Sequence, residues 1–461
     1  MPGELAELLA ARSAEAFDLH AEHVNPQFVR MLRTIGFDRQ WARGEGAYLV
    51  DADGNRFLDM LGGFGMYNVG RANRAVRDAL ADALRLDLPG RVALGITHLA
   101  GMLAEELLRR APGSLARALF TSSGAESVEA AIKLGRAATG RSRVVSVESG
   151  FHGLTLGALS ANGSESFTRR FQPLLPGFSR VPFNDLEALE AELRSEDVAL
   201  FVTEPIVGHG VLLPEPGYLE GAQALCRRYG TLFCLDEVAT GFGRTGRMFA
   251  CDHWGLEPDV MTVSKALSGG YVPVGACLMS TRVYDAVFDS MEHALSHGST
   301  FAPNDLAMVA GLATLRELDA QSLVERSARM GELLLERTRP LVDRHDVVKD
   351  VRGLGLFWAI EFGEPEGSGR TTWRLIERMQ PALFSQLVVV PLFTEHRVLI
   401  QVAGHAMNVV RAMPPLVLSE ADVDRFATAL DAVLVGARKI PRSMARFALR
   451  AAQARRPARA R

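Results

Sequence analysis

Residues 232–265 decide the fold of this chain, because they hold two short apolar runs, LFCLDEV (232–238) and DVMTVSK (259–265). Asp236 lies near the end of the first run and Lys265 closes the second, 29 residues later, a spacing that suits one strand–helix–strand step. Similar runs lie upstream, and they are ALFT (118–121), RVVSVES (143–149) and VALFVTEP (198–205). Helical patterns separate the runs, and this alternation predicts an α/β fold with a parallel sheet and helices on both faces.

The pattern changes on either side of this alternation. GAYLVDADGNRFLDM (46–60) predicts a β-hairpin around an Asp-Gly-Asn turn. Two strand candidates near the C-terminus, VKDVRGLGLFWAIEF (348–362) and HRVLIQVAG (396–404), predict a smaller α+β unit. The remaining patterns are helix and loop over 1–45, helix over 75–110 with a break near 88–90, and a long helical stretch over 305–345.

Composition excludes several classes of protein. With 461 residues, 48% hydrophobic and 23% charged, the chain has the composition of a globular protein rather than a disordered one. A net charge of −3 argues against a nucleic-acid-binding protein. No uninterrupted apolar run reaches about 18 residues, and the acidic N-terminal sequence does not match a secretory signal. Four cysteines without C-x-x-C spacing indicate buried thiols in a reducing cytoplasm and no metal site.

The charge is unevenly distributed. Residues 438–461 carry eight arginines and one lysine without any acid, so the rest of the chain carries −12. Met444, Phe447 and Leu449 lie among these arginines, and the segment could contact an anionic membrane weakly as a basic amphipathic helix. The alternative is a frayed, solvated extension.

Of the 51 basic residues only Lys133, Lys265, Lys349 and Lys439 are lysines. Lys265 alone lies where neighbouring strands end, and a lysine there can form a Schiff base with an aldehyde. Asp236 ends the neighbouring strand candidate, and a buried carboxylate needs a cationic partner, such as a protonated ring nitrogen. The alternative is a polar strand end.

A third signal is the turn Thr121–Glu126, which connects a strand candidate to a helix. A helix N-terminus suits a phosphate, although small residues there often serve only as an N-cap. A lysine, a carboxylate and a helix N-terminus together match an aldehyde cofactor with a phosphate and a basic ring nitrogen, which is pyridoxal 5′-phosphate.

The sequence also resembles the class III pyridoxal-phosphate-dependent aminotransferases of fold type I, from about residue 25 to 435. Within that family it looks most like the putrescine and ornithine-type members and a branch that includes an aminotransferase of hopanoid biosynthesis. The motifs that carry the resemblance are LGGFG (61–65), SGAES (123–127), FHG (151–153), EPI (204–206), DEV (236–238), TGFGRTG (240–246), SKAL (264–267), STF (299–301), QVAGH (401–405) and PPL (414–416).

The resemblance implies a large domain with a mixed, mostly parallel seven-stranded sheet and a smaller α+β domain. It implies these parts: 1–60 as the N-terminal segment of the small domain, 61–305 as the large domain, 306–437 as the C-terminal small domain and 438–461 as the basic tail. It further implies a homodimer with shared active sites.

The resemblance also implies residue roles. Lys265 holds the cofactor aldehyde and moves the proton at the substrate Cα, and Asp236 keeps the ring nitrogen protonated. The cofactor-binding set comprises Ser123, Gly124, Ala125, Phe151, His152, Glu204, Asp236, Val238, Lys265 and Thr300, with Thr300 serving the other subunit's cofactor. The substrate-binding set comprises Phe64, Tyr67, His209 and Arg411, with Arg411 as a carboxylate clamp. A solvated strand arginine is the alternative for Arg411.

Three positions depart from the family pattern. Relatives commonly read EPIQGEGG, and here Val207 replaces the glutamine and His209 the glutamate of that motif. Ala239 stands where relatives read DEVQTG and place a glutamine. In ornithine-type relatives that glutamate pairs with the clamp arginine and masks it. His209 cannot act as a permanent anion, so the same masking is not expected here. His209 is therefore either a substrate contact or a loop residue.

We thus expect an aminotransferase that moves an amino group between an amino donor (amino acid, primary amine or diamine) and an aldehyde or ketone. A terminal aldehyde or primary amine on at least one side is favoured, such as one from a lipid or secondary metabolite. The alternatives are an aminomutase or decarboxylating transaminase of the same class and, less favoured, a cofactor-binding protein without catalysis.

Overall fold

The computed structural model describes residues 3–90, 92, 94–366, 369–379, 381–404 and 407–437. The basic tail, 438–461, lies outside the described residues, so its contact with membranes stays a prediction. Within the described part no helix is long and apolar enough to cross a membrane.

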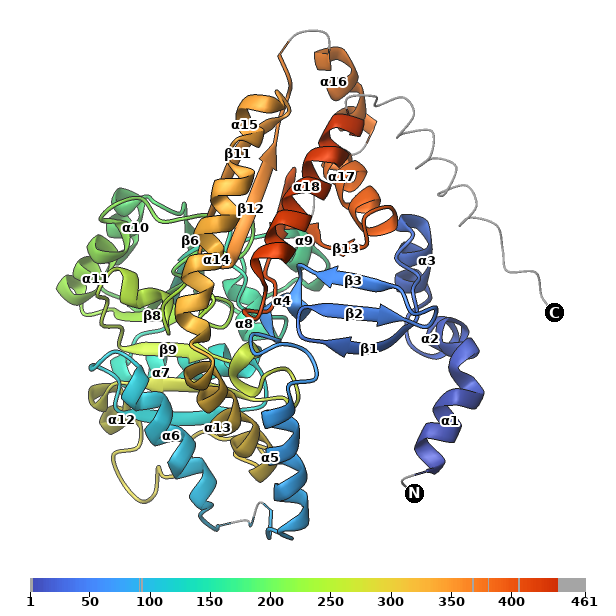
Figure 1. The fold of residues 1–461 in the computed structure, drawn as a ribbon. Helices are drawn as coiled ribbons and strands as arrows, with labels where there is room; N and C mark the ends of the chain where they lie inside the picture. Colours follow the sequence, from blue (N-terminus) through green and yellow to red (C-terminus); the bar gives the residue numbers. More distant parts are fainter. Residues whose placement is uncertain are drawn as a thin grey trace.

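A seven-stranded sheet forms the centre of the larger part of the molecule (Figure 1). Its order is β4-β10-β9-β8-β7-β5-β6, and β10 alone runs in the opposite direction to the other six strands. The strands are β4 (Arg117–Thr121), β5 (Arg143–Val147), β6 (Phe178–Val181), β7 (Val198–Thr203), β8 (Leu232–Asp236), β9 (Val260–Val263) and β10 (Gly275–Met279). This topology confirms the predicted α/β fold with a mixed, mostly parallel sheet.

Both faces of this sheet are buried, which explains why its strands are continuous apolar runs. Along β8, Cys234 packs on the face covered by α7 (Gly124–Thr139), and Phe233 and Leu235 pack on the opposite face. The helices around the sheet are α5 (Arg74–Arg85), α6 (His98–Arg110), α8 (Leu156–Ala161), α9 (Glu165–Thr168), α10 (Leu186–Leu193), α11 (Tyr218–Tyr229), α12 (Thr281–Val287) and α13 (Asp305–Ala320).

The chain ends contribute two smaller sheets. Strands β1 (Trp41–Glu45), β2 (Tyr48–Asp51) and β3 (Arg56–Asp59) form one of them, and β13 (Val398–Leu399) joins its edge in parallel with β3. The other has the order β11-β12-β15-β14. Its strands are β11 (Val348–Leu354), β12 (Phe357–Phe362), β14 (Gln401–Val402) and β15 (Val409–Ala412). The pairing of β3 with β13 brings the N-terminal segment to the C-terminal part of the chain, while the four-part domain division stays a prediction.

Helices α13 and α14 follow one another from the large sheet to the smaller sheets (Figure 1). The remaining helices are α1 (Glu4–Arg12), α2 (Ala16–His23), α3 (Pro26–Ile35), α14 (Leu323–Thr338), α15 (Leu341–Arg344), α16 (Arg370–Met379), α17 (Leu383–Thr394) and α18 (Glu420–Ala437). The segment labelled α4 (Gly62–Gly65) is a left-handed turn, because its four residues have φ between 54° and 83°.

Of the expectations about single elements, one is confirmed and others need correction. The hairpin of 46–60 is confirmed by the antiparallel pairing of β2 with β3. The expectation of only helix and loop over 1–45 is wrong, because the polar and largely exposed β1 pairs with β2 without apolar alternation. Strands β6 and β10 were not predicted. HRVLIQVAG is not one strand, since its halves β13 and β14 join different sheets.

The predicted helix between β8 and β9 is also absent from the described chain, where only a short 3₁₀ turn, Ala250–His253, is present. The glycine-rich segment TGFGRTG occupies this connection instead. Its Arg244 is fully buried and donates to the carbonyl oxygens of Leu356 (3.0 Å) and Pro414 (2.6 Å). These tertiary bonds hold an irregular backbone that periodicity does not reveal.

Candidate active site

A buried carboxylate marks the C-terminal end of β8. Asp236 is 2% exposed. One oxygen, Oδ2, lies 2.8 Å from His152 Nδ1, and Oδ1 accepts bonds from Thr262 Oγ1 (3.0 Å) and the Val238 N–H (3.1 Å). Burial opposes protonation of His152, but the hydrogen bond and charge of Asp236 outweigh it and raise the His152 pKa. The cation that Asp236 needs inside the protein is therefore supplied in part by His152.

Lys265 follows β9 and begins a 3₁₀ turn, Lys265–Ser268. Its φ is +37°, a left-handed conformation that costs energy for a residue other than glycine and is often found at functional sites. Burial lowers the pKa of the Lys265 amine, the charge of Asp236 raises it, and that of Arg411 lowers it further. The lowered pKa increases the fraction of neutral amine, which is the nucleophilic form.

The N-terminus of α7 approaches the turn after β8. Ser123 caps this helix, because its Oγ accepts the Glu126 N–H at 3.2 Å. The first N–H groups of a helix, here those of Gly124 and Ala125, have no partner within the helix and can bind an anion. A Cβ added at Gly124 would lie 2.9 Å from Val238 Cγ1, so the close approach of the two segments requires a glycine.

The Gly208 peptide links Glu204 to Arg411 on β15. Its N–H donates to Glu204 Oε1 at 3.0 Å, and its carbonyl oxygen accepts from Arg411 Nη1 at 2.6 Å. Glu204 is 3% exposed and also accepts the Phe151 N–H through Oε2 at 3.0 Å. Burial raises the Glu204 pKa. Glu204 thus holds the backbone that carries Phe151 and His209.

His209 is half-buried, with its ring centroid 5.8 Å from that of Phe151. Burial, together with the charge of Arg411, lowers the His209 pKa to about 4. The side chain is therefore neutral near pH 7, and it does not supply the anion that relatives place at this position.

Three other residues of the predicted set, Phe64, Thr300 and Tyr67, form no hydrogen bond with Asp236, Glu204 or Arg411 in the described structure. Phe64 is 47% exposed on the left-handed turn, and Thr300 is exposed, so this chain does not enclose either side chain. The Tyr67 ring packs against the Arg71 guanidinium, and Arg71 Cζ lies 4.1 Å from the centroid of the Tyr67 ring. A Cβ at Gly270 would lie 2.5 Å from the Tyr67 ring, so Tyr67 supports the turn that follows Lys265.

The sequence patterns did not point to three residues of this region. Thr262 binds Asp236, Phe167 stacks on His209 with ring centroids 5.5 Å apart, and Arg352 binds the turn that carries His209. Thr262 lies within the same predicted strand as Lys265 and could have been found there. Phe167 and Arg352 belong to no motif. Within the described residues no group of three or more His, Cys, Asp or Glu side chains could hold a metal ion.

Comparison with known proteins places this geometry in context. Residues 36–434 match the model of the family described as aminotransferase class-III. The aminotransferase PigE of a Serratia species is 36% identical over 452 residues, covering 91% of this chain and 53% of the relative. The chain therefore spans about half the length of that curated relative.

Solved structures show the same architecture. An amine transaminase from an uncultivated Pseudomonas species, in its pyridoxal-phosphate-bound form, has a TM-score of 0.75 and 31% identity over 86% of this chain and 94% of its own. The ornithine aminotransferase of Toxoplasma gondii has a TM-score of 0.78 and 28% identity over 88% of this chain and 92% of its own.

We expect Gly124→Ala to weaken the binding of pyridoxal phosphate about 10- to 100-fold, since the added methyl group must displace Val238 at a cost of about 1–3 kcal/mol. Fluorescence titration of the apoprotein measures this. Gly436→Ala is the control, because its Cβ meets no atom within 4 Å. Unchanged affinity in Gly124→Ala would show that the α7 N-terminus does not hold the phosphate.

Proposed function

This chain belongs to the class III aminotransferases and uses pyridoxal phosphate, and we propose that it transfers an amino group from an amino acid or primary amine to an aldehyde or ketone. The observation that carries the proposal is the Lys265 amine, whose pKa is lowered by burial, in the field of the buried Asp236 carboxylate. A buried lysine or a buried carboxylate alone occurs in many kinds of protein, whereas the two at adjacent strand ends match one cofactor.

The residues present fit this cofactor. When bound, pyridoxal phosphate supplies an aldehyde that joins an amine and a protonated ring that accepts electrons. Gly124 and Ala125 would bind the phosphate, Phe151 would pack on the ring, and Asp236 would keep a proton on the ring nitrogen. His152, which the resemblance assigns to the cofactor, orients Asp236 in this structure.

Lys265 would then carry the proton at the substrate Cα. Its lowered pKa suits that role, because a base works best when its pKa lies near the working pH. The fixed partners of Asp236 and the strained Lys265 backbone hold both groups in place before a substrate arrives.

Arg411 is the proposed clamp for a substrate carboxylate. In the described structure its hydrogen bond is to a neutral carbonyl oxygen, that of Gly208, and its Nε is buried without a partner. A carboxylate could replace this carbonyl and form two charge-assisted bonds. A primary amine without a carboxylate would leave the Arg411–Gly208 bond intact, so a donor or acceptor of that kind is compatible with Arg411 in one half-reaction.

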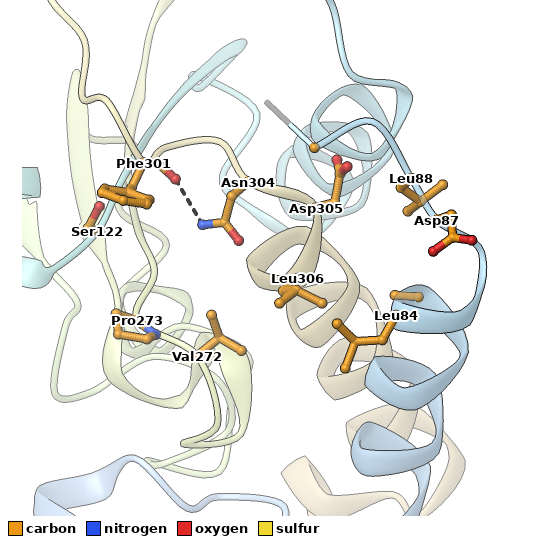
Figure 2. Close-up of a pocket in the computed structure, with 12 residues that line it drawn as sticks. Leu84, Asp87, Leu88, Ser122, Val272, Pro273, Phe301, Asn304, Asp305 and Leu306 are labelled. Carbon is orange, nitrogen blue, oxygen red and sulfur yellow. Dashed lines mark hydrogen bonds between the residues drawn. The ribbon is translucent and has the colours of Figure 1, made fainter. Parts of the chain in front are cut away.

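We further propose a homodimer located in the cytoplasm. Large apolar side chains around a cavity of about 720 Å³ are exposed, with Leu84 at 66% and Phe301 at 74% (Figure 2). Ile96, at 98%, borders a second cavity of about 660 Å³. Exposed apolar surface of this extent supports an interface, and Thr300 lies next to Phe301 within it. All four cysteines are buried and free, which suits a reducing compartment.

Lys265→Ala should remove the absorbance of the lysine-bound cofactor and lower the turnover number for transamination at least about 10²- to 10⁴-fold, because it removes both attachment and proton transfer. Visible spectroscopy and a coupled assay measure the two effects. Lys133→Ala, at an exposed position of α7, is the matched control. Full turnover by Lys265→Ala would contradict the proposal.

A donor panel of putrescine, ornithine, glutamate and alanine should convert the lysine-bound cofactor with at least one donor, and turnover should then require a carbonyl acceptor. Loss of the visible absorbance band identifies the donor. Release of carbon dioxide would indicate the decarboxylating alternative, and amine formation without an acceptor would indicate the aminomutase.

Phe301→Glu combined with Ile96→Glu should convert the dimer into monomers of 50.1 kDa, since each change places a charge on exposed apolar surface. Sedimentation velocity measures the molar mass. Leu375→Glu, at a position on α16 that is 57% exposed, is the control. A double variant that remains dimeric would place the interface elsewhere.

A further inference from the structure

The turn 207–212 presents His209 on a tightly held backbone. The Val207 N–H donates to the Leu212 carbonyl oxygen (3.1 Å), and the Leu212 N–H returns the bond (3.0 Å). Val211 has a φ of +51°, which is a strained, left-handed conformation for a β-branched residue. Such strain persists only where surrounding contacts impose it, and it is found mostly at functional positions.

Arg352 of β11 supplies those contacts. Its Nη2 donates to the Gly210 carbonyl oxygen at 2.7 Å, and its Nε donates to the Val211 carbonyl oxygen at 3.0 Å. Asp350 and Glu361 anchor Nη1 of the same guanidinium, each at 2.7 Å. Together with the Arg411 bond to Gly208, these Arg352 bonds hold the turn on both sides of His209.

The Arg352 and Arg411 bonds to this turn place the His209 ring in an aromatic layer. His209 stacks on Phe167 at an interplanar angle of 17°, and Phe151 approaches both rings at centroid distances of 5.8 and 5.1 Å. A Cβ at Gly404 would lie 3.0 Å from His209 Cδ2, so the glycine of the QVAGH motif makes room for this ring. All three rings are half-buried and retain accessible surface for a ligand.

The charges nearby disfavour a second cation. Arg411 contributes a positive charge that acts on both His209 and Lys265. In the described part of the chain the carboxylates that act on Lys265 are Asp236 and Glu204, and both already accept hydrogen bonds. The distal ammonium of a diamine would therefore meet Arg411 without a free carboxylate, whereas an alkyl chain would meet neutral rings.

We propose that His209 and Phe167 form an apolar wall that selects substrates with an uncharged alkyl or aryl body over diamines, and that Arg352 is the positioning residue that holds this wall. The inference rests on the proposed aminotransferase function and adds its substrate class. Neither Phe167 nor Arg352 takes part in the amino transfer itself.

The test compares ethylamine, n-hexylamine and 1,6-diaminohexane as donors for the holoenzyme. For the wild type we expect kcat/KM to rise about fourfold for each methylene that reaches the wall, and n-hexylamine to exceed 1,6-diaminohexane at least tenfold. His209→Glu should reduce that preference at least tenfold, because a carboxylate lowers the positive charge of the region. His209→Phe keeps an uncharged ring and should preserve the preference within about threefold.

Arg352→Met should raise the KM for n-hexylamine about tenfold while kcat changes less than about threefold, and the KM for ethylamine should stay constant because its chain does not reach the wall. Equilibrium titration of the cofactor absorbance should show the same chain-length dependence in the dissociation constants. Arg337→Met, which removes an exposed arginine paired with Asp424, is the matched control.

Three results would overturn the inference: a wild type that prefers the diamine, equal effects of Arg352→Met on both monoamines, or loss of the preference in His209→Phe. A wild type that converts neither amines nor amino acids, with the cofactor absorbance unchanged, would instead contradict the proposed function. Melting temperatures of all variants separate these outcomes from simple misfolding.

Discussion

Asp236 brings a negative charge to a buried strand end, and this charge organises the residues around it. A carboxylate that leaves water without partners costs several kcal/mol, so its oxygens must be satisfied by neighbouring groups. His152, Thr262 and the Val238 N–H supply these bonds from three separate segments. The same charge supports the protonation of His152 and opposes the effect of burial on Lys265.

Glu204 organises the other side of the site in a similar way. Its two oxygens accept the N–H groups of Phe151 and Gly208, and thereby join the loop after β5 to the turn that carries His209. Arg411 and Arg352 reach the same turn from the C-terminal sheet through backbone carbonyl oxygens. The turn that carries His209 therefore joins the loop after β5 to the C-terminal sheet.

Glycines decide how closely the segments of the site approach one another. Gly124 lets the α7 N-terminus contact Val238, Gly270 accommodates the Tyr67 ring, and Gly404 accommodates His209. Each of these glycines lies in or beside a motif by which the sequence resembles its family. The motifs therefore contain glycines that allow close packing as well as residues that carry chemical groups.

The sequence by itself determined the α/β fold, the hairpin of 46–60 and the cofactor, and it singled out Lys265 and Asp236 as the proposed central pair, because apolar strands and rare chemical groups are local signals. Tertiary structure alone decided the antiparallel β10, the irregular connection at Arg244, and the contacts of Phe167 and Arg352. These features depend on groups far apart in the chain: Arg352 meets a turn about 140 residues away. No periodicity or motif encodes such a meeting, since only folding brings the arginine and the carbonyl oxygens together.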